Sequence, residues 1–276
     1  MSFRIIISFL LIFVFFVSCS KDTVKKSTIK QTNLELQMIE AYQEGLKELK
    51  RGDALFAAKR FNEAEILFPQ SEIAPQAALM AAYSYYSQNY YGDSIAELDR
   101  FLKVYPNNKN ISYAEYLLGL CYYEQIVDEK KDLKSIENSK RIFLGLIKKY
   151  PNTDFAKDAE FKLDLINDII ASKEMYVGRY YFERKKWIAA INRFKIVIDN
   201  YETTIYVEEA LHRLVEIYYI LGLEVEAKKY ANLLGYNYQS SEWYENSYSI
   251  FDKSYAINKI KKENNGILKK FKSLFN

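Results

Sequence analysis

A short motif recurs along this chain: an aromatic residue followed by proline, or by a polar residue in place of the proline. The five copies are Phe68-Pro69, Tyr105-Pro106, Tyr150-Pro151, Tyr201-Glu202 and Tyr238-Gln239. By residue number, successive copies lie 37, 45, 51 and 37 residues apart, so two units carry 8 and 14 additional residues. A fixed period of this size is typical of repeat proteins, in which stacked units bury a core that no single unit can form.

Residue size is also fixed relative to this motif. Twelve residues before the second position of the motif the residue is always small: Ala57, Ser94, Ser139, Ala190 and Ala227. Eight residues before it most residues are large: Phe61, Leu98, Phe143, Phe194 and Ala231. Eight residues after the first four copies the residue is always alanine: Ala77, Ala114, Ala159 and Ala210. Small residues in phase with large ones indicate pairs of helices that interlock closely.

We therefore predict an all-α fold, a tetratricopeptide-like right-handed solenoid of about five helix–turn–helix units plus a capping helix. Only 9 Gly and 4 Pro in 276 residues agree with helices throughout. The solenoid is expected over residues 33–250. Thr32 and Glu35 have capping-box spacing, which places the start of the first helix near Asn33.

The additional residues are assigned to two segments. The eight-residue insertion is expected in the charged segment 127–133. The 14-residue extension, 155–174, predicts one long helix with Phe161, Leu165 and Ile169 on one apolar stripe. Turns are expected at Gly52-Asp53, at 89–93 and at Gly222, and the capping helix from Glu242 to about Tyr255.

The N-terminal segment differs in composition from the rest. Arg4 precedes an apolar run that ends at Val17 and is followed by Ser18-Cys19-Ser20. This run, thirteen residues from Ile5 and apolar except for Ser8, is too short to span a bilayer and is typical of a secretory signal. Because a cysteine follows a small residue there, the segment resembles a lipoprotein signal peptide over residues 1–18. That resemblance implies acylation of Cys19 and a tether over 19–32; the alternative is an ordinary signal peptide with an incidental cysteine.

The remaining composition excludes several functions. With Cys19 acylated, Cys121 has no partner for an intramolecular disulfide and is expected to be buried. The segment 251–276 is a basic tail with Lys269, Lys270 and Lys272 among apolar residues, whereas the helical core is slightly acidic. Nucleic-acid binding is therefore not expected, because phosphate neutralisation requires a basic face.

No catalytic constellation is present in the sequence. The chain has one histidine, no paired metal-ligand spacing, no phosphate loop and no nucleophile elbow. His212 is expected to be an ordinary helix-face residue. Segment 127–133 is not a calcium loop, because Leu133 stands where the turn requires glycine. We predict no enzyme activity, no metal and no cofactor other than the lipid on Cys19.

Tyrosine is abundant instead, at 25 of 276 residues, and five pairs are adjacent in sequence. These pairs are 85–86, 90–91, 122–123, 180–181 and 218–219. One ring of each pair can fill the core while its neighbour faces a groove, where aromatic rings with polar tips suit peptide recognition. The alternative is that these rings serve packing alone.

Several segments resemble one family. They are Tyr42-Gln43-Glu44-Gly45, Phe101-Leu102-Lys103-Val104-Tyr105-Pro106, Tyr116-Leu117-Leu118-Gly119-Leu120, Met175-Tyr176-Val177-Gly178-Arg179-Tyr180-Tyr181 and Val207-Glu208-Glu209-Ala210-Leu211. With the signal and Cys19, they are similar to the BamD family, the outer-membrane lipoproteins of the β-barrel assembly machinery. The resemblance covers roughly residues 19–250. It implies a non-catalytic scaffold, lipid-anchored at the periplasmic face of the outer membrane of a Gram-negative bacterium.

The resemblance also implies partners and sites. C-terminal units would dock a periplasmic domain of BamA, and an N-terminal groove would bind unfolded barrel precursors. Other lipoproteins of the machinery are further expected partners. The BamA-side candidates are Arg193, Arg179, Tyr180 and Trp187, and the precursor-groove candidates are Tyr83, Tyr86 and Tyr123.

Two alternatives stay open. Arg193 could instead form an intramolecular ion pair, with Glu183 or Glu226 as the expected partner. The chain could also be another periplasmic repeat adaptor in cell-envelope organisation. Such adaptors carry an N-terminal coiled coil, for which Leu34–Leu49 is too short.

Overall fold

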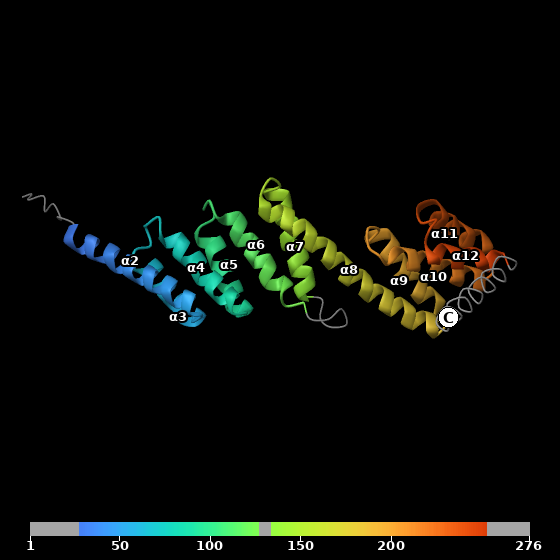
Figure 1. Ribbon diagram of the computed structural model, residues 1–276, viewed down its shortest axis with the longest axis horizontal. Coiled ribbons are helices and arrows are strands. Elements are labelled where there is room, and N and C mark those ends of the chain that lie inside the picture. The colour runs from blue at the N-terminus through green and yellow to red at the C-terminus, as the bar shows by residue number, and fades with distance from the viewer. Residues whose placement is uncertain (1–27, 127–133, 253–276) are drawn as a thin grey trace, which may run out of the picture. The chain divides into compact units, whose positions relative to one another are not determined.

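A computed structural model describes residues 28–126 and 134–252, and every regular element within those ranges is an α-helix (Figure 1). The helices are α2 (Thr28–Arg51), α3 (Ala54–Leu67), α4 (Ala74–Ser87), α5 (Tyr91–Val104), α6 (Ile111–Tyr123), α7 (Lys134–Lys149), α8 (Asp154–Glu183), α9 (Trp187–Asn200), α10 (Val207–Ile220), α11 (Glu224–Asn237) and α12 (Glu242–Phe251). They form two compact units, which divide between Ala77 and Ala78. The predicted all-α fold is confirmed.

The first unit is built on the hairpin of α2 and α3. Gly52 has a φ of +86°, the left-handed conformation that glycine adopts without strain, so the chain reverses there. Asp53 then caps α3 by accepting a hydrogen bond from the Phe56 amide at 3.0 Å. Helix α2 begins at Thr28, earlier than the predicted start near Asn33. No glycine or proline lies between Thr28 and Asn33 to interrupt the helix, so the capping-box spacing at Thr32 does not mark where the helix begins.

The second unit repeats the same hairpin. Within it α6 pairs with α7, α8 with α9 and α10 with α11, and each hairpin packs on the next through α5–α6, α7–α8 and α9–α10. The turns contain a residue with positive φ at Asn89, Lys185 and Gly222. Helix α12 packs on both α10 and α11 and is capped by Ser241, whose hydroxyl accepts from the Trp243 amide. The predicted capping helix is confirmed as far as Phe251; Tyr255 lies outside the described residues.

The recurring small and large residues meet inside the hairpins. All positions predicted to be small are fully buried, and so are Phe61, Leu98, Phe143 and Phe194. A Cβ added to Gly178 would lie 2.5 Å from the Phe194 ring, and one added to Gly119 would lie 2.4 Å from Phe143. In the hairpin of α4 and α5 the corresponding pair is Ala82 and Leu98. Alanine there is larger than the glycine of the other hairpins, and leucine is smaller than the phenylalanine. Total volume is therefore kept nearly constant, as a close-packed core requires.

Serine at two of the small positions adds a hydrogen bond between the helices of a hairpin. Ser94 donates to the carbonyl of Ala82 at 2.9 Å, and Ser139 donates to the carbonyl of Gly119 at 3.1 Å. Because both hydroxyls are fully buried, the bond offsets the cost of removing them from water.

The longest helix, α8, confirms the predicted single helix across the extension. Its first half contributes Leu163 and Ile166 to the same core cluster as α6 and α7. Its second half contributes Met175 to the cluster formed with α9, α10 and α11. The predicted stripe does not face the core throughout, because 72% of Phe161 and 52% of Leu165 are exposed. The predicted insertion at 127–133 lies outside the described residues.

Candidate functional site

The predicted BamA-side residues lie on the hairpin of α8 and α9. Arg179, on α8, forms two hydrogen bonds to Glu209 of α10, with Nε 2.8 Å from Oε1. Glu209 is also 3.5 Å from the Arg213 guanidinium. This bidentate ion pair is charge-assisted and joins two hairpins. Arg179 therefore makes an internal contact.

Arg193 makes an intramolecular ion pair, but with a different partner from either that we expected. Its Nη1 lies 2.9 Å from Oε2 of Glu174 on α8. Neither Glu183 nor Glu226 is that partner, because residue 174 of the long helix lies opposite residue 193 of the antiparallel α9. The Arg193 side chain keeps 40% of its surface exposed, whereas that of Glu174 keeps 15%. An external carboxylate can therefore reach this guanidinium.

Tyr180 and Trp187 differ in exposure. Tyr180 is 45% exposed, and the Arg184 guanidinium lies 3.6 Å from its ring centroid. Trp187 is half-buried and packs edge-on against Phe182 at 5.5 Å. The four candidates thus share one hairpin, but Arg179 reaches α10 while Arg193 reaches from α9 to α8. Arg193 and Tyr180 are the more available of them for a partner.

The precursor-groove candidates lie on α4 and α6. Tyr83 is 37% exposed, and Tyr86 is half-buried against Tyr91 of α5 at 5.9 Å. Burial raises the pKa of Tyr86 to about 12, so its hydroxyl stays neutral. Tyr123, at the end of α6, has the ammonium of Lys162 from α8 at 5.0 Å from its ring.

Sequence reasoning missed an aromatic row that joins α6 to α8. Phe155 lies 5.4 Å from Tyr113 and 5.3 Å from Tyr116, measured between ring centroids. The Tyr116 hydroxyl donates to Asp158 at 2.6 Å, and burial together with this carboxylate raises its pKa. The spacing Tyr-x-x-Tyr around Ala114 was the available signal, since residues three apart share a helix face.

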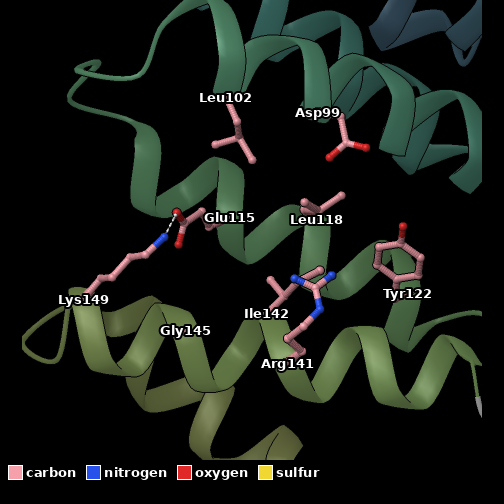
Figure 2. Close-up of a pocket in the computed structure, with 9 residues that line it drawn as sticks. All are labelled: Asp99, Leu102, Glu115, Leu118, Tyr122, Arg141, Ile142, Gly145 and Lys149. Atoms are coloured by element: carbon pink, nitrogen blue, oxygen red, sulfur yellow. Dashed lines mark hydrogen bonds and ion pairs between the residues drawn. The ribbon is translucent and has the colours of Figure 1, made fainter.

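A cleft of about 340 Å³ lies between α5, α6 and α7 (Figure 2). It is lined by Asp99, Leu102, Glu115, Leu118, Tyr122, Arg141, Ile142, Gly145 and Lys149. Lys149 and Glu115 form an ion pair of 2.6 Å at one end, and Arg141 points from α7 toward the space below Asp99 (Figure 2). The lining mixes both charge signs with aliphatic side chains and has no group placed for covalent chemistry.

Two residues with chemical potential are built into the core. Cys121 is buried, its thiol lies 3.2 Å from the Ser94 hydroxyl, and burial raises its pKa to about 11, as befits an unreactive thiol. His212 is buried too, with Nδ1 2.8 Å from the Ser247 hydroxyl of α12 and its ring tilted on Trp243. The expected helix-face histidine is thus a packing residue beneath the cap. Within 28–126 and 134–252, no three His, Cys, Asp or Glu side chains gather as a metal would require.

The pair of Glu209 and Arg179 gives a testable pH dependence. Burial alone would raise the pKa of Glu209, but the hydrogen bonds and charges of Arg179 and Arg213 hold it below the ordinary 4.5. A carboxylate with a lowered folded-state pKa stabilises the fold above its unfolded-state pKa, and that stabilisation is lost as the pH falls through the folded-state value.

We expect Glu209→Gln to cost stability at about pH 6.5 and much less at about pH 3.5, which urea unfolding at both values would measure. Glu137→Gln, at an exposed position of α7, is the control and should change little at either pH. An equal cost for Glu209→Gln at both pH values would show that its charge is not what stabilises the fold.

Known proteins are similar to this chain over the same helical hairpins. The family model YfiO, described as an outer membrane lipoprotein, matches residues 34–233. The chain belongs to the BamD family of outer membrane lipoproteins. A relative from Rickettsia prowazekii is 45% identical over 209 residues, which cover 76% of this chain and 83% of the relative. One from Caulobacter vibrioides is 39% identical over 228 residues, which cover 83% of this chain and 74% of the relative.

The BamD family also includes more distant sequences that match this chain. The relative from Neisseria meningitidis serogroup A is 30% identical over 232 residues, covering 80% of this chain and 86% of its own. All three are named outer membrane protein assembly factor BamD. In the part of the chain that the structure describes, no helix combines the length and apolar content needed to cross a bilayer.

Proposed function

We propose that this chain is a non-catalytic scaffold of outer-membrane β-barrel assembly, anchored by acylated Cys19 at the periplasmic face of the membrane. In this proposal its C-terminal hairpins dock a periplasmic domain of BamA, and its tyrosine-lined helices hold unfolded barrel precursors. The observation that carries the proposal is the family match over residues 34–233, almost the whole set of helical hairpins. A stack of hairpins offers an extended surface for partners without a catalytic centre.

Arg193 is the centre of the proposed BamA-docking face. Its ion pair with Glu174 is only partly shielded, and such pairs contribute little to stability, typically below about 1 kcal/mol. The same guanidinium offers planar, bidentate hydrogen bonding to a carboxylate of a partner. Exposed Tyr180 lies on the same hairpin and supplies an aromatic ring of the kind enriched in interfaces.

Arg193→Glu should weaken co-purification with BamA at least tenfold while leaving helicity intact. The matched control is Arg100→Glu, because Arg100 is 39% exposed and pairs with Glu97 at 2.9 Å, the same distance and nearly the same exposure as Arg193, although within one helix. The charge swap Glu174→Arg with Arg193→Glu restores an internal pair and should recover the melting temperature without recovering BamA binding. If Arg193→Glu and Arg100→Glu retain BamA equally, the docking face lies elsewhere.

The precursor-binding part of the proposal is supported by Tyr83, Tyr86 and Tyr123. Their rings combine apolar faces with polar hydroxyls, a combination suited to holding unfolded chain by side-chain contacts. No covalent step is needed, and release follows when the precursor folds and hides its apolar residues.

A further inference from the structure

The cleft between α5, α6 and α7 contains two charged groups that the fold does not neutralise (Figure 2). Among the residues that the structure describes, Asp99 of α5 has no hydrogen-bond or ion-pair partner. Arg141 of α7 has only Asn138, at 3.5 Å, which is longer than an ordinary hydrogen bond. The other charged residues of the lining, Glu115 and Lys149, neutralise each other through their 2.6 Å ion pair. One carboxylate and one guanidinium are therefore available to a ligand.

Asp99 and Arg141 lie on opposite walls of the cleft. They come from neighbouring hairpins, because α5 and α7 both pack on α6. Figure 2 shows the carboxylate and the guanidinium directed toward the space between them. Both act on one phenol: the pKa of Tyr122 is raised by burial and by Asp99 and is lowered in part by Arg141. The two charges thus face the same space without forming an ion pair with each other.

The rest of the lining is mainly aliphatic. Leu102, Leu118 and Ile142 contribute to it, and Leu118 and Ile142 are buried. Gly145 of α7 belongs to the lining too, and a Cβ added there would meet no atom within 4 Å. At about 340 Å³ the cleft is at the small end of the range of ligand sites, roughly 300–1,000 Å³. A cleft of this volume suits a compact molecule with an aliphatic part.

The opposite charges of Asp99 and Arg141 select the kind of ligand. A ligand with only a carboxylate would bind Arg141 but would bring its charge close to that of Asp99. An amine without a carboxylate would meet the same repulsion from Arg141. A molecule that carries both charges is attracted by both walls, and those with one charge are disfavoured.

The ion pair at one end of the cleft favours a free amino acid over a peptide chain. Lys149 of α7 and Glu115 of α6 join their helices there (Figure 2). A peptide running along the cleft would have to pass this bridge, and its backbone offers polar groups but no charge in mid-chain. A free amino acid carries its ammonium and its carboxylate on one carbon, so it can present both within a small volume.

The cleft is separate from the surface where α6 faces α8. Tyr116 and Tyr123 of α6 contact Asp158 and Lys162 of α8. The residues of α6 that line the cleft are instead Glu115, Leu118 and Tyr122. A ligand in the cleft therefore leaves the precursor-groove candidate Tyr123 uncovered.

We propose that this cleft binds a small aliphatic amino acid as a zwitterion. Its ammonium pairs with Asp99, its carboxylate pairs with Arg141, and its side chain lies on Leu118 and Ile142. The site goes beyond the proposed scaffold function and does not depend on it. Because the bound molecule connects α5 with α7, it stabilises the packing of two neighbouring hairpins by mass action.

Equilibrium dialysis of the full-length lipoprotein in nanodiscs against radiolabelled leucine tests the site, with empty nanodiscs as the background. Unlabelled leucine should displace the label at least tenfold better than isocaproate or isoamylamine, which each keep one of its two charges. Asp99→Asn and Arg141→Gln should each weaken leucine binding at least tenfold. The matched controls are Glu137→Gln and Arg51→Gln, which remove exposed charges outside the cleft and should bind like the wild type.

Gly145→Leu separates a blocked cleft from a misfolded protein. The new side chain enters open space, and leucine favours a helix more than glycine does, so the melting temperature should not fall. Leucine binding should nevertheless be lost. Persistent binding by Gly145→Leu, or by both charge variants, places the site elsewhere.

The ligand assignment has its own contrary outcomes. Equal displacement by isocaproate or isoamylamine shows that the site does not read a zwitterion, and stronger displacement by phosphoethanolamine identifies a lipid head group instead. Wild-type protein that shows no saturable leucine binding overturns the proposal. None of these results bears on BamA docking or precursor binding, so the proposed function stands or falls separately.

Discussion

Gly178→Ala is expected to destabilise the protein by about 1–3 kcal/mol, the usual cost of overpacking a buried contact. The added Cβ would lie 2.5 Å from the Phe194 ring, which is fully buried. Urea unfolding followed by circular dichroism measures the difference in unfolding free energy. The matched control is Gly145→Ala in α7, where an added Cβ meets no atom within 4 Å. That change should raise stability by about 0.5–1 kcal/mol, because alanine favours a helix more than glycine does.

The second hairpin of the chain indicates how to rescue Gly178→Ala. Ala82 and Leu98 there occupy the places of Gly178 and Phe194. Phe194→Leu alone should cost about 1 kcal/mol or more through the cavity it leaves. Combined with Gly178→Ala it should cost less than the sum of the two single changes, since the alanine occupies that space. Strict additivity would show that the two residues do not compete for one volume.

Cys19→Ala is expected to move the protein from the membrane fraction into the soluble periplasmic fraction. Each buried methylene of an acyl chain contributes about 0.8 kcal/mol, so several chains anchor a protein that one chain would hold only weakly. Fractionation followed by immunoblotting, with a mass measurement of the mature N-terminus, tests both the location and the acylation. Cys121→Ala is the control and should stay in the membrane, because its thiol is buried within the helices. Membrane retention of the Cys19→Ala protein would contradict acylation as the anchor.

The features predicted correctly from the sequence are those that repeat. The two helices of each hairpin approach closely, which limits residue size at the same position of every unit. The recurrence of alanine at Ala114, Ala159 and Ala210 could therefore be seen without a structure. The turn at Gly222 and the cap from Glu242 were predictable for a similar reason, because both depend on local backbone chemistry.

Features that depend on a single contact between distant segments were not predictable. The pair of Arg193 with Glu174 depends on the register of α9 against α8, and a carboxylate elsewhere in sequence was equally plausible. The bond between His212 and Ser247 depends on where α12 lies on α10. Exposure of Phe161 was hidden for a further reason: periodicity shows that apolar residues share one face of a helix, but not whether another helix covers that face.

The length of α8 has a mechanical consequence. At 1.5 Å per residue its 30 residues extend about 45 Å without a loop that could absorb a change of tilt. Glu174 and Phe161 therefore lie on one continuous helix. Glu174 is the residue that pairs with Arg193, and Phe161 lies near the start of the helix. A change in the tilt of α8 at Glu174 therefore also moves Phe161, because continuous helix, with twelve residues between the two positions, connects them.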